Sequence, residues 1–285
     1  MPDPGAAGTP LIEVRDLTRT YKRTRTSLRR PAPEVHALRG MSFDVRTGQR
    51  FGIVGESGSG KSTLVRLLSA LDAATSGSIR FDGEEIVGRS ERSLRFLRRQ
   101  LQIVFQDPMG SLDPRMKVRD IIAEPMLSQG HDEAARRQRV VELLEAVSLP
   151  ADALGRFPHQ FSGGQRQRIS IARALSVQPK VLVADEAVSA LDVSVRAQIL
   201  NLIAELVDRY QLTLLFVSHD LSVIRHVCDT VAVMNEGRLV ELGLTEEIYD
   251  QPKDPYTQRL IAAAPSLERS LERLRPTSFR EASGP

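Results

Sequence analysis

The sequence predicts an α/β fold built on a parallel sheet, and two patterns carry that prediction. In the first, the apolar strand Arg50–Val54 runs directly into a glycine-rich loop and then a helix that begins near Lys61. In the second, the apolar runs Val181–Ala184 and Leu214–Ser218 enclose the amphipathic segment Ser194–Tyr210. A helical crossover of this kind joins parallel strands, because parallel neighbours cannot be connected by a tight turn. We therefore expect the loops after these strands to share one edge of the sheet.

The other elements follow in chain order. Residues 1–10 are expected to be a disordered leader, and the basic segment KRTRTSLRRPAP, residues 22–33, a solvated loop unless it meets anionic lipid or a partner chain. Segment 108–157 predicts a helical insertion, and a helical tail follows Thr245. Further strands are predicted at Leu11–Val14, Met41–Val45, Ser78–Phe81 and Leu101–Phe105, with a hairpin of Thr230–Met234 and Arg238–Glu241. The helix after the glycine loop is expected to bury Leu64, Leu67, Leu68 and Leu71.

Composition restricts the class of protein. The 285 residues are 41% hydrophobic, which is enough for a substantial core. The formal charge of +3 does not imply a polyanionic partner, and no nucleic-acid partner is expected. A single cysteine, Cys228, excludes an intramolecular disulfide and a four-cysteine metal site, and we expect it to be buried. No segment approaches the roughly 18 apolar residues of a membrane span, so any membrane contact is expected to be peripheral.

The segment GESGSGKST fits the phosphate-binding pattern Gly-x-x-x-x-Gly-Lys-Ser. Its glycines let backbone N–H groups turn onto phosphate oxygens, and the following helix adds its positive end. Lys61 is expected to pair with the β and γ phosphates of a nucleotide, and the Ser62 hydroxyl to bind Mg²⁺. The predicted nucleotide contacts are Gly55, Glu56, Ser57, Gly58, Ser59, Gly60, Lys61, Ser62 and Thr63.

Two carboxylates end the strand in KVLVADE. An acidic pair at this position is costly unless it faces a metal, water or a partner. Asp185 suits a contact to Mg²⁺, and Glu186 suits the base that orients the attacking water. A helix cap accounts for one carboxylate but not for both beside a glycine loop.

A second anion site is predicted at the start of the helix in FSGGQRQRISIARAL. Ser162, Gly163, Gly164 and Gln165 would present backbone donors at a helix N-terminus. Taken alone, Ser162 would be an ordinary helix cap. One chain thus contains two predicted phosphate-binding surfaces.

These motifs together resemble the ATP-binding-cassette (ABC) ATPases. The matching segments stand in the order and approximate spacing of that family: Gly55–Thr63, Ser162–Gln165, Val181–Glu186, Ser189–Asp192 and Ser218–Asp220. The stretches VFQDPMGSLDPR, PHQFSGGQRQRI, SALDVSVRAQILNLI and DPYTQRLIAAAP look like the oligopeptide/dipeptide importer branch. The resemblance spans nearly the whole chain.

The resemblance implies roles for four further residues. Tyr21 would stack on adenine, unless it is only a strand-face tyrosine. Gln106 would touch Mg²⁺ and the attacking water, unless it only ends a strand. His219 would hold the γ phosphate, unless it is a plain surface histidine. Asp192 would couple the two nucleotide sites of a dimer, unless it is a helix cap.

The fold implied by the resemblance is a P-loop NTPase cassette with a RecA-like core, an antiparallel β subdomain and a helical subdomain. The ATPase domain would cover residues 11–248, with a helical subdomain at about 108–164. Residues 249–285 would form a C-terminal extension of the peptide-importer type. Two cassettes would clasp, so that each ATP lies between the glycine loop of one and the Ser-Gly-Gly segment of the other.

The implied function is ATP-powered import of di- or oligopeptides or a related small solute. The partners would be two transmembrane permease subunits, a second ABC ATPase that is either a copy or a relative of this chain, and indirectly an extracytoplasmic solute-binding protein. The chain would lie at the cytoplasmic face of the cell membrane. The alternatives are an ABC ATPase that acts on DNA or ribosomes, and a catalytically idle regulatory cassette.

The chain departs from the family pattern after the acid pair and in the C-terminal segment, among other places. Ala187 stands where proline commonly follows the acid pair, which removes a preset φ from the turn. Asp254-Pro255-Tyr256 takes the place of a His-Pro-Tyr sequence, so no role is assigned to that histidine.

Overall fold

The computed structural model describes residues 10–22 and 34–263. The predicted leader, except Pro10, and the basic loop after Lys22 lie outside the described residues. So does the last part of the C-terminal extension, residues 264–285.

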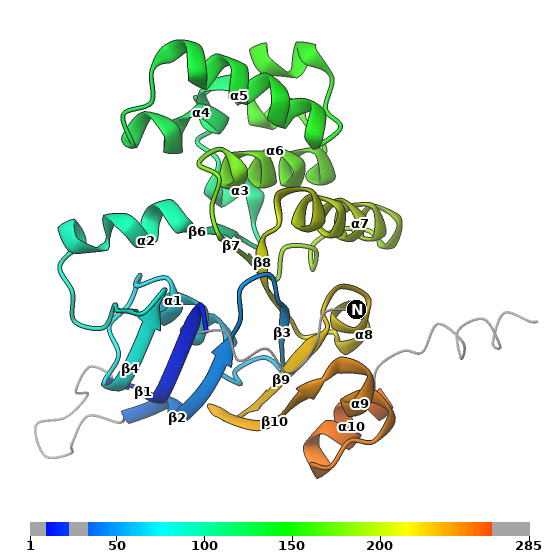
Figure 1. Cartoon of the computed structure of the whole chain (residues 1–285). Coiled ribbons are helices and arrows are strands. Elements are labelled where there is room, and N and C mark those ends of the chain that lie inside the picture. Colours follow the sequence, from blue (N-terminus) through cyan, green and yellow to red (C-terminus); the bar gives the residue numbers. More distant parts are fainter. Residues whose placement is uncertain (1–9, 23–33, 264–285) are drawn as a thin grey trace, which may run out of the picture.

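A six-stranded, mostly parallel sheet forms the centre of the described chain (Figure 1). Its strand order is β10-β9-β3-β8-β7-β6, and only the edge strand β10 runs antiparallel to its neighbour. The α/β fold predicted from the sequence is therefore confirmed. The strands of this sheet are β3 (Arg50–Val54), β6 (Leu101–Val104), β7 (Val181–Asp185), β8 (Thr213–Ser218), β9 (Thr230–Asn235) and β10 (Arg238–Leu244).

A separate antiparallel sheet of order β2-β1-β4-β5 lies beside the central sheet (Figure 1). The first strand is longer than predicted, because its pairing with β2 continues through register shifts from Ile12 to Lys22. Asp82-Gly83 forms the turn into the short last strand. The strands are β1 (Ile12–Lys22), β2 (Glu34–Val45), β4 (Ser76–Phe81) and β5 (Glu84–Glu85).

Helices cover both faces of the central sheet. Along β7 and β8, alternate residues belong to two hydrophobic cores: Val183 and Leu215 pack with α1 and the antiparallel sheet, whereas Leu182 and Phe216 pack with α6, α7 and α8. This alternation follows from the two-residue period of a strand. The helices concerned are α1 (Lys61–Leu68), α2 (Arg95–Gln100), α6 (Gly163–Leu175), α7 (Val193–Tyr210) and α8 (Leu221–Val227).

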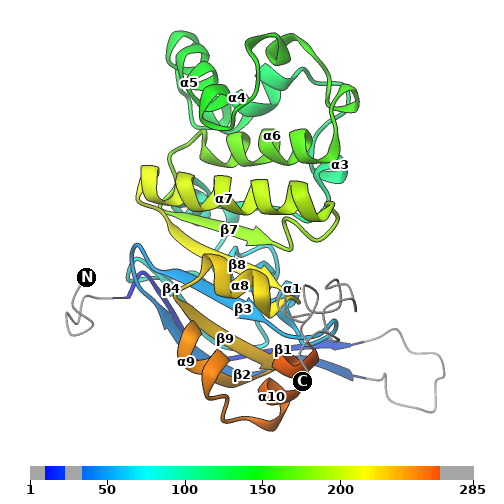
Figure 2. The same cartoon turned by 90° about the vertical axis from the view of Figure 1, so that its right-hand side faces the viewer.

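The predicted helical insertion follows β6 and lies at one end of the molecule (Figure 2). Its stripe of Val140, Leu143, Leu144 and Val147 is buried, as expected from the helical spacing. The C-terminal helices pack at the opposite end, beside β10 (Figure 2). These elements are α3 (Pro108–Ser111), α4 (Val118–Ser128), α5 (Glu133–Ala146), α9 (Thr245–Asp250) and α10 (Pro255–Ala263), with short 3-10 helices at Glu91–Leu94, Ala151–Gly155 and Pro158–Gln160.

Two expectations about single residues are wrong. Leu71 is 53% exposed, because α1 ends at Leu68 and the chain turns at Ala70, whose φ is +49°. Phe105 lies beyond the end of β6 and is 42% exposed. Cys228 is buried, as expected, and burial raises the pKa of its thiol.

The turn between β9 and β10 supports the glycine loop. Glu236 and Gly237 both have positive φ, the geometry of a type I′ hairpin turn. The Gly237 N–H donates to the carbonyl oxygen of Ser59 at 2.9 Å, and its own carbonyl accepts from the Arg39 N–H at 2.8 Å. One glycine thus joins the glycine loop to both sheets.

We predict that Gly237→Ala destabilises the fold more than Gly83→Ala. Both glycines have φ between +76° and +78°, but a Cβ at Gly237 would lie 2.6 Å from the Ala37 oxygen, whereas a Cβ at Gly83 meets open space. The strained φ should cost about 1 kcal/mol in each variant, and the clash roughly 1–3 kcal/mol more at Gly237. Urea unfolding measures both values. Equal losses would contradict the supporting role of this turn.

Candidate functional site

The carboxyl ends of three neighbouring strands bring the predicted catalytic groups to one edge of the sheet. Val54 of β3 pairs with Ser218 of β8, and Asp185 of β7 pairs with Val217, so the three strands end at the same level. The glycine loop, the acid pair and His219 follow these ends. Ligand sites in open α/β sheets lie at this edge.

Lys61 occupies the centre of this cluster. Its side chain is 4% exposed, and its Nζ donates to the carbonyl oxygens of Gly55 at 2.7 Å and Glu56 at 2.9 Å. The same Nζ lies 4.0 Å from the Glu186 carboxylate. Burial lowers the pKa of Lys61, and the carboxylates of Glu186 and Asp185 oppose that shift. Lys61 is thus placed where a phosphate group could reach it.

The glycine loop is packed closely against its surroundings. Gly60 has a φ of +104°, and a Cβ there would lie 2.6 Å from the Ala37 oxygen. A Cβ at Gly55 would collide with the Met234 carbonyl. The Ser59 hydroxyl is buried and has no hydrogen-bond partner in the structure. Positions 55 and 60 require glycine, because the loop passes against neighbouring backbone atoms there.

The three predicted Mg²⁺ ligands line one cavity. Ser62 from α1, Gln106 after β6 and Asp185 from β7 surround a space of about 450 Å³. Within the part of the chain that the structure describes, Asp185 Oδ1 is buried without a hydrogen-bond partner. Burial raises the pKa of Asp185 and the charge of Glu186 raises it further, with Lys61 and Arg66 opposing. Hydroxyl, amide and carboxylate oxygens suit Mg²⁺, so the donor set fits that ion.

Glu186 stands in a strained turn directly beyond β7. Its φ is +48°, and its N–H donates to the Val217 carbonyl at 3.0 Å. The Glu186 carbonyl accepts from the N–H of Ser189 at 3.1 Å and from the Ser189 hydroxyl at 2.9 Å. Buried Ala187 follows in place of the family's proline. Hydrogen bonds from Ser189 therefore hold the turn where a proline ring would have preset it.

His219 approaches Glu186 from the end of β8. Its Nδ1 lies 3.6 Å from the second carboxylate oxygen of Glu186, and its side chain is 56% exposed. Glu186 therefore lies between the Lys61 ammonium and the His219 ring, and the imidazole is open to a ligand.

The second predicted anion site is away from this cluster in a single chain. Ser162 and Gln165 form a reciprocal cap at the start of α6: the Gln165 N–H donates to Ser162 Oγ at 3.3 Å, and the Ser162 N–H to Gln165 Oε1 at 3.0 Å. Helix α6 and the glycine-loop helix α1 pack on opposite faces of the central sheet (Figures 1 and 2). The helix cap expected as the simpler reading of Ser162 is present.

Two other predicted residues have defined surroundings. The Tyr21 hydroxyl donates to Asp72 at 2.6 Å, and the Arg19 guanidinium lies 4.4 Å from the centre of its ring. Asp192 stands at the N-cap position of α7, but its side chain makes no capping hydrogen bond. Capping therefore does not account for the Asp192 carboxylate.

Sequence reasoning missed two supports of the glycine loop. One is Gly237, described above. The other is Tyr256 of α10, whose hydroxyl accepts a hydrogen bond from the Glu56 N–H at 2.9 Å. The departure at Asp254-Pro255-Tyr256 drew attention to this segment, but it did not predict the contact of Tyr256 with the glycine loop.

Comparison with known proteins decides the family. A family model described as ABC transporter matches residues 38–189. The chain belongs to the ABC transporter family. Of its ABC relatives, a di/tripeptide transport ATP-binding protein of Pseudomonas aeruginosa is 46% identical over 258 residues, 90% of this chain and 80% of that protein. An oligopeptide transport ATP-binding protein of Mycobacterium tuberculosis is 49% identical over 256 residues, 90% of this chain but only 42% of that protein.

Solved structures agree with the ABC cassette fold. A dimeric ATP-binding cassette in a post-hydrolysis state, bound to ADP and phosphate, has a TM-score of 0.72 at 27% identity, and the match covers 82% of this chain and 98% of that one. A component of an ABC transporter complex from Clostridium perfringens has a TM-score of 0.74 at 27% identity, covering 92% and 99%. Among the described helices of this cassette, none combines the length and apolarity needed to cross a membrane.

We predict that Asp185→Asn raises the Tm of the nucleotide-free and Mg²⁺-free protein at pH 7. Because burial raises the pKa of Asp185 in the folded state, the charged carboxylate destabilises the fold at pH values above that raised pKa, and the penalty disappears on acidification. The same variant should lower Mg²⁺-dependent ATP hydrolysis about 10- to 100-fold. Thermal unfolding between pH 7 and pH 4 checks the first effect. A lower Tm for the variant at pH 7 would contradict it.

Proposed function

We infer that the chain is the ATP-hydrolysing, nucleotide-binding subunit of an ABC importer for di- or oligopeptides or a related small solute. The observation that carries the ATPase function is the convergence of Lys61, the acid pair and His219 at one sheet edge. The names of the relatives, which are peptide transport proteins, support the cargo class. Both names describe transport, so these relatives do not favour the alternative function on DNA or ribosomes.

The reaction rests on positioning and charge. The backbone N–H groups of the glycine loop and Lys61 would hold the phosphates, and Mg²⁺, held by Ser62, Gln106 and Asp185, would neutralise charge on them. Glu186 would orient the attacking water, while His219 would contact the γ phosphate. Little covalent chemistry is left to the protein, because phosphoryl transfer depends on alignment and electrostatic stabilisation.

A second cassette completes each site in this proposal. Ser162, Gly163 and Gly164 lie at the start of α6, on the face of the sheet opposite α1, so they cannot grip the phosphates held by the glycine loop of their own chain. A copy of this chain or a related ATPase would supply the matching segment. Asp192, whose side chain caps nothing, would then face the partner cassette.

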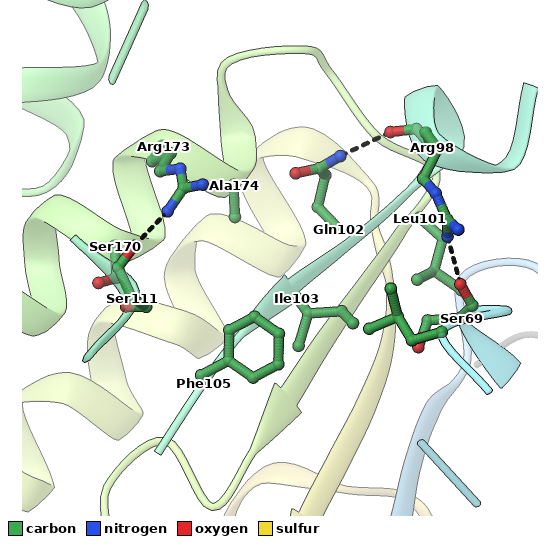
Figure 3. A pocket seen from close by; sticks show the side chains of 11 residues that line it. Ser69, Arg98, Leu101, Gln102, Ile103, Phe105, Ser111, Ser170, Arg173 and Ala174 are labelled. Atoms are coloured by element: carbon green, nitrogen blue, oxygen red, sulfur yellow. Dashed lines mark hydrogen bonds between the residues drawn. The ribbon is translucent and has the colours of Figure 1, made fainter. Parts of the chain in front are cut away.

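The permease subunits would dock between the central sheet and the helical insertion, beside Gln106. A cavity of about 190 Å³ opens there, lined by Phe105, Gln102 and Ile103 after α2 and by Arg173 of α6 (Figure 3). The Arg173 guanidinium donates to the Ser111 carbonyl at 2.6 Å, which joins α6 to α3 on one side of this cavity. A coupling segment seated here, at the cytoplasmic face of the membrane, would contact Phe105, the chain neighbour of Gln106. An extracytoplasmic solute-binding protein would deliver the cargo to the permeases.

A tagged Glu186→Gln chain tests the function. We expect it to co-purify with two integral membrane proteins and to bind ATP normally, but to hydrolyse ATP about 10²-fold more slowly or worse, because the amide cannot orient and deprotonate the water. Peptide uptake by cells that carry only this variant should stop. Glu205→Gln, the same change at an exposed position of α7, should retain both activities.

Two outcomes would count against this account. Unchanged turnover of Glu186→Gln would show that another group orients the water. Recovery of the wild-type chain with ribosomes or DNA, and without membrane proteins, would contradict the transport function.

A second prediction concerns the dimer. Ser162→Arg places a bulky cation at the expected contact with the other cassette, so ATP hydrolysis should fall about tenfold or more. ADP binding to the isolated chain should stay unchanged, because Ser162 lies away from that chain's own glycine loop. Titration calorimetry and a steady-state ATPase assay separate the two effects. Full activity of the purified complex would argue against the clasped dimer.

A further inference from the structure

The C-terminal segment contacts the glycine loop through the buried residue Tyr256. The Tyr256 hydroxyl accepts a hydrogen bond from the Glu56 N–H at 2.9 Å, across 200 positions of sequence. Tyr256 is 6% exposed and belongs to the larger of the two hydrophobic cores. The ring of Tyr256 is therefore anchored in the packed interior, and its hydroxyl reaches the partly buried backbone at the start of the glycine loop.

Carboxylates hold Tyr256 in this position. Glu241 of β10 accepts from the backbone N–H of Lys253 at 2.9 Å and from that of Asp254 at 3.2 Å. The Asp254 side chain in turn accepts from the Tyr256 N–H at 2.7 Å. The aspartate that stands in place of histidine thus fixes the first turn of α10, which fixes the tyrosine.

Tyr256 and Lys61 hold the same peptide group. The peptide between Gly55 and Glu56 donates its N–H to Tyr256, and its carbonyl oxygen accepts from Lys61 at 2.7 Å. The N–H and C=O of a trans peptide point in opposite directions, so the two side chains grip this plane from opposite edges. This peptide is the first of the glycine loop, and the N–H groups that follow it in the loop are expected to bind phosphate.

We propose that Tyr256 is a positioning residue for nucleotide binding, which keeps the Gly55–Glu56 peptide oriented while Lys61 engages phosphate. The inference rests on the proposed ATP site at Gly55–Thr63. The ammonium group of Lys61 interacts with two loop carbonyls and with the Glu186 carboxylate, and it would also have to bind the incoming phosphates. The Tyr256 hydroxyl, in contrast, accepts the hydrogen bond of the Glu56 N–H. The tyrosine therefore fixes the peptide independently of where Lys61 moves.

The test is Tyr256→Phe in the full-length chain. The phenyl ring keeps the packing of α10 but leaves the Glu56 N–H without its acceptor. We expect the KM for ATP and the Kd for ADP to rise about fivefold, as for the loss of one hydrogen bond, with kcat at saturating ATP within about twofold. A loss of uniform binding has this signature, whereas general unfolding would lower kcat through loss of active protein.

Two control variants separate positioning from packing. Tyr249→Phe removes a hydroxyl from the neighbouring helix α9, where the ring lies 4.3 Å from the Arg225 guanidinium, and should leave KM unchanged. Thr257→Ser removes a methyl group from the fully buried residue next to Tyr256 and keeps its hydroxyl beside Glu241. If Thr257→Ser weakens ADP binding as much as Tyr256→Phe does, packing of α10 explains the effect and the inference is overturned.

The failure of the inference differs from the failure of the ATP site. If the wild-type chain binds ADP and Tyr256→Phe binds it equally well, only the positioning role is overturned. If the wild-type chain binds neither ADP nor ATP, the proposed nucleotide site is wrong and the role of Tyr256 falls with it.

Discussion

The arrangement of the groups at the carboxyl edge of the central sheet depends on the interactions of the buried Lys61 ammonium group. A cation that is 4% exposed is costly unless it finds partners, and here they are two carbonyls of the glycine loop and the carboxylate of Glu186. The carbonyls follow β3, and the carboxylate follows β7. One charge therefore connects two strand ends and holds the loop curled before any ligand arrives. A phosphate that binds there meets a cation already in place, which lowers the reorganisation that binding requires.

The sheet explains why these groups can meet at all. Parallel strands end together, so side chains more than 120 positions apart, such as Lys61 and Glu186, come within ion-pair distance. The positive φ of Glu186 then turns the chain so that its carboxylate stays at that edge while Ala187 enters the core. Strain of this kind persists only where the surroundings hold it, and Val217 and Ser189 supply the necessary hydrogen bonds.

The sequence was informative wherever a pattern is local. The span of β3 matched Arg50–Val54 because a short apolar run before a glycine loop has few alternatives, and the stripe from Val140 to Val147 was buried because helical spacing was unambiguous. The predicted burial of Leu71 was wrong because the helical spacing of leucines continues past Leu68, where the helix ends. The bonds from Gly237 and Tyr256 to the glycine loop could not be foreseen, since each joins segments about 180 to 200 positions apart and leaves no periodic trace.

A bound cation would change the electrostatic environment of the acid pair. Among the described residues, one carboxylate oxygen of Asp185 is buried without a hydrogen-bond partner, beside a second carboxylate, and this arrangement costs stability. A bound cation would remove both costs at once, since the lone oxygen would become its ligand and its charge would offset the repulsion between the two acids. Cation binding would therefore stabilise the fold, because a ligand that binds only the folded chain shifts the equilibrium toward that state. The fold around the sheet edge must be stable enough to carry this cost, and the hydrogen bonds from Gly237 to Ser59 and from Glu56 to Tyr256 help to hold the glycine loop in place.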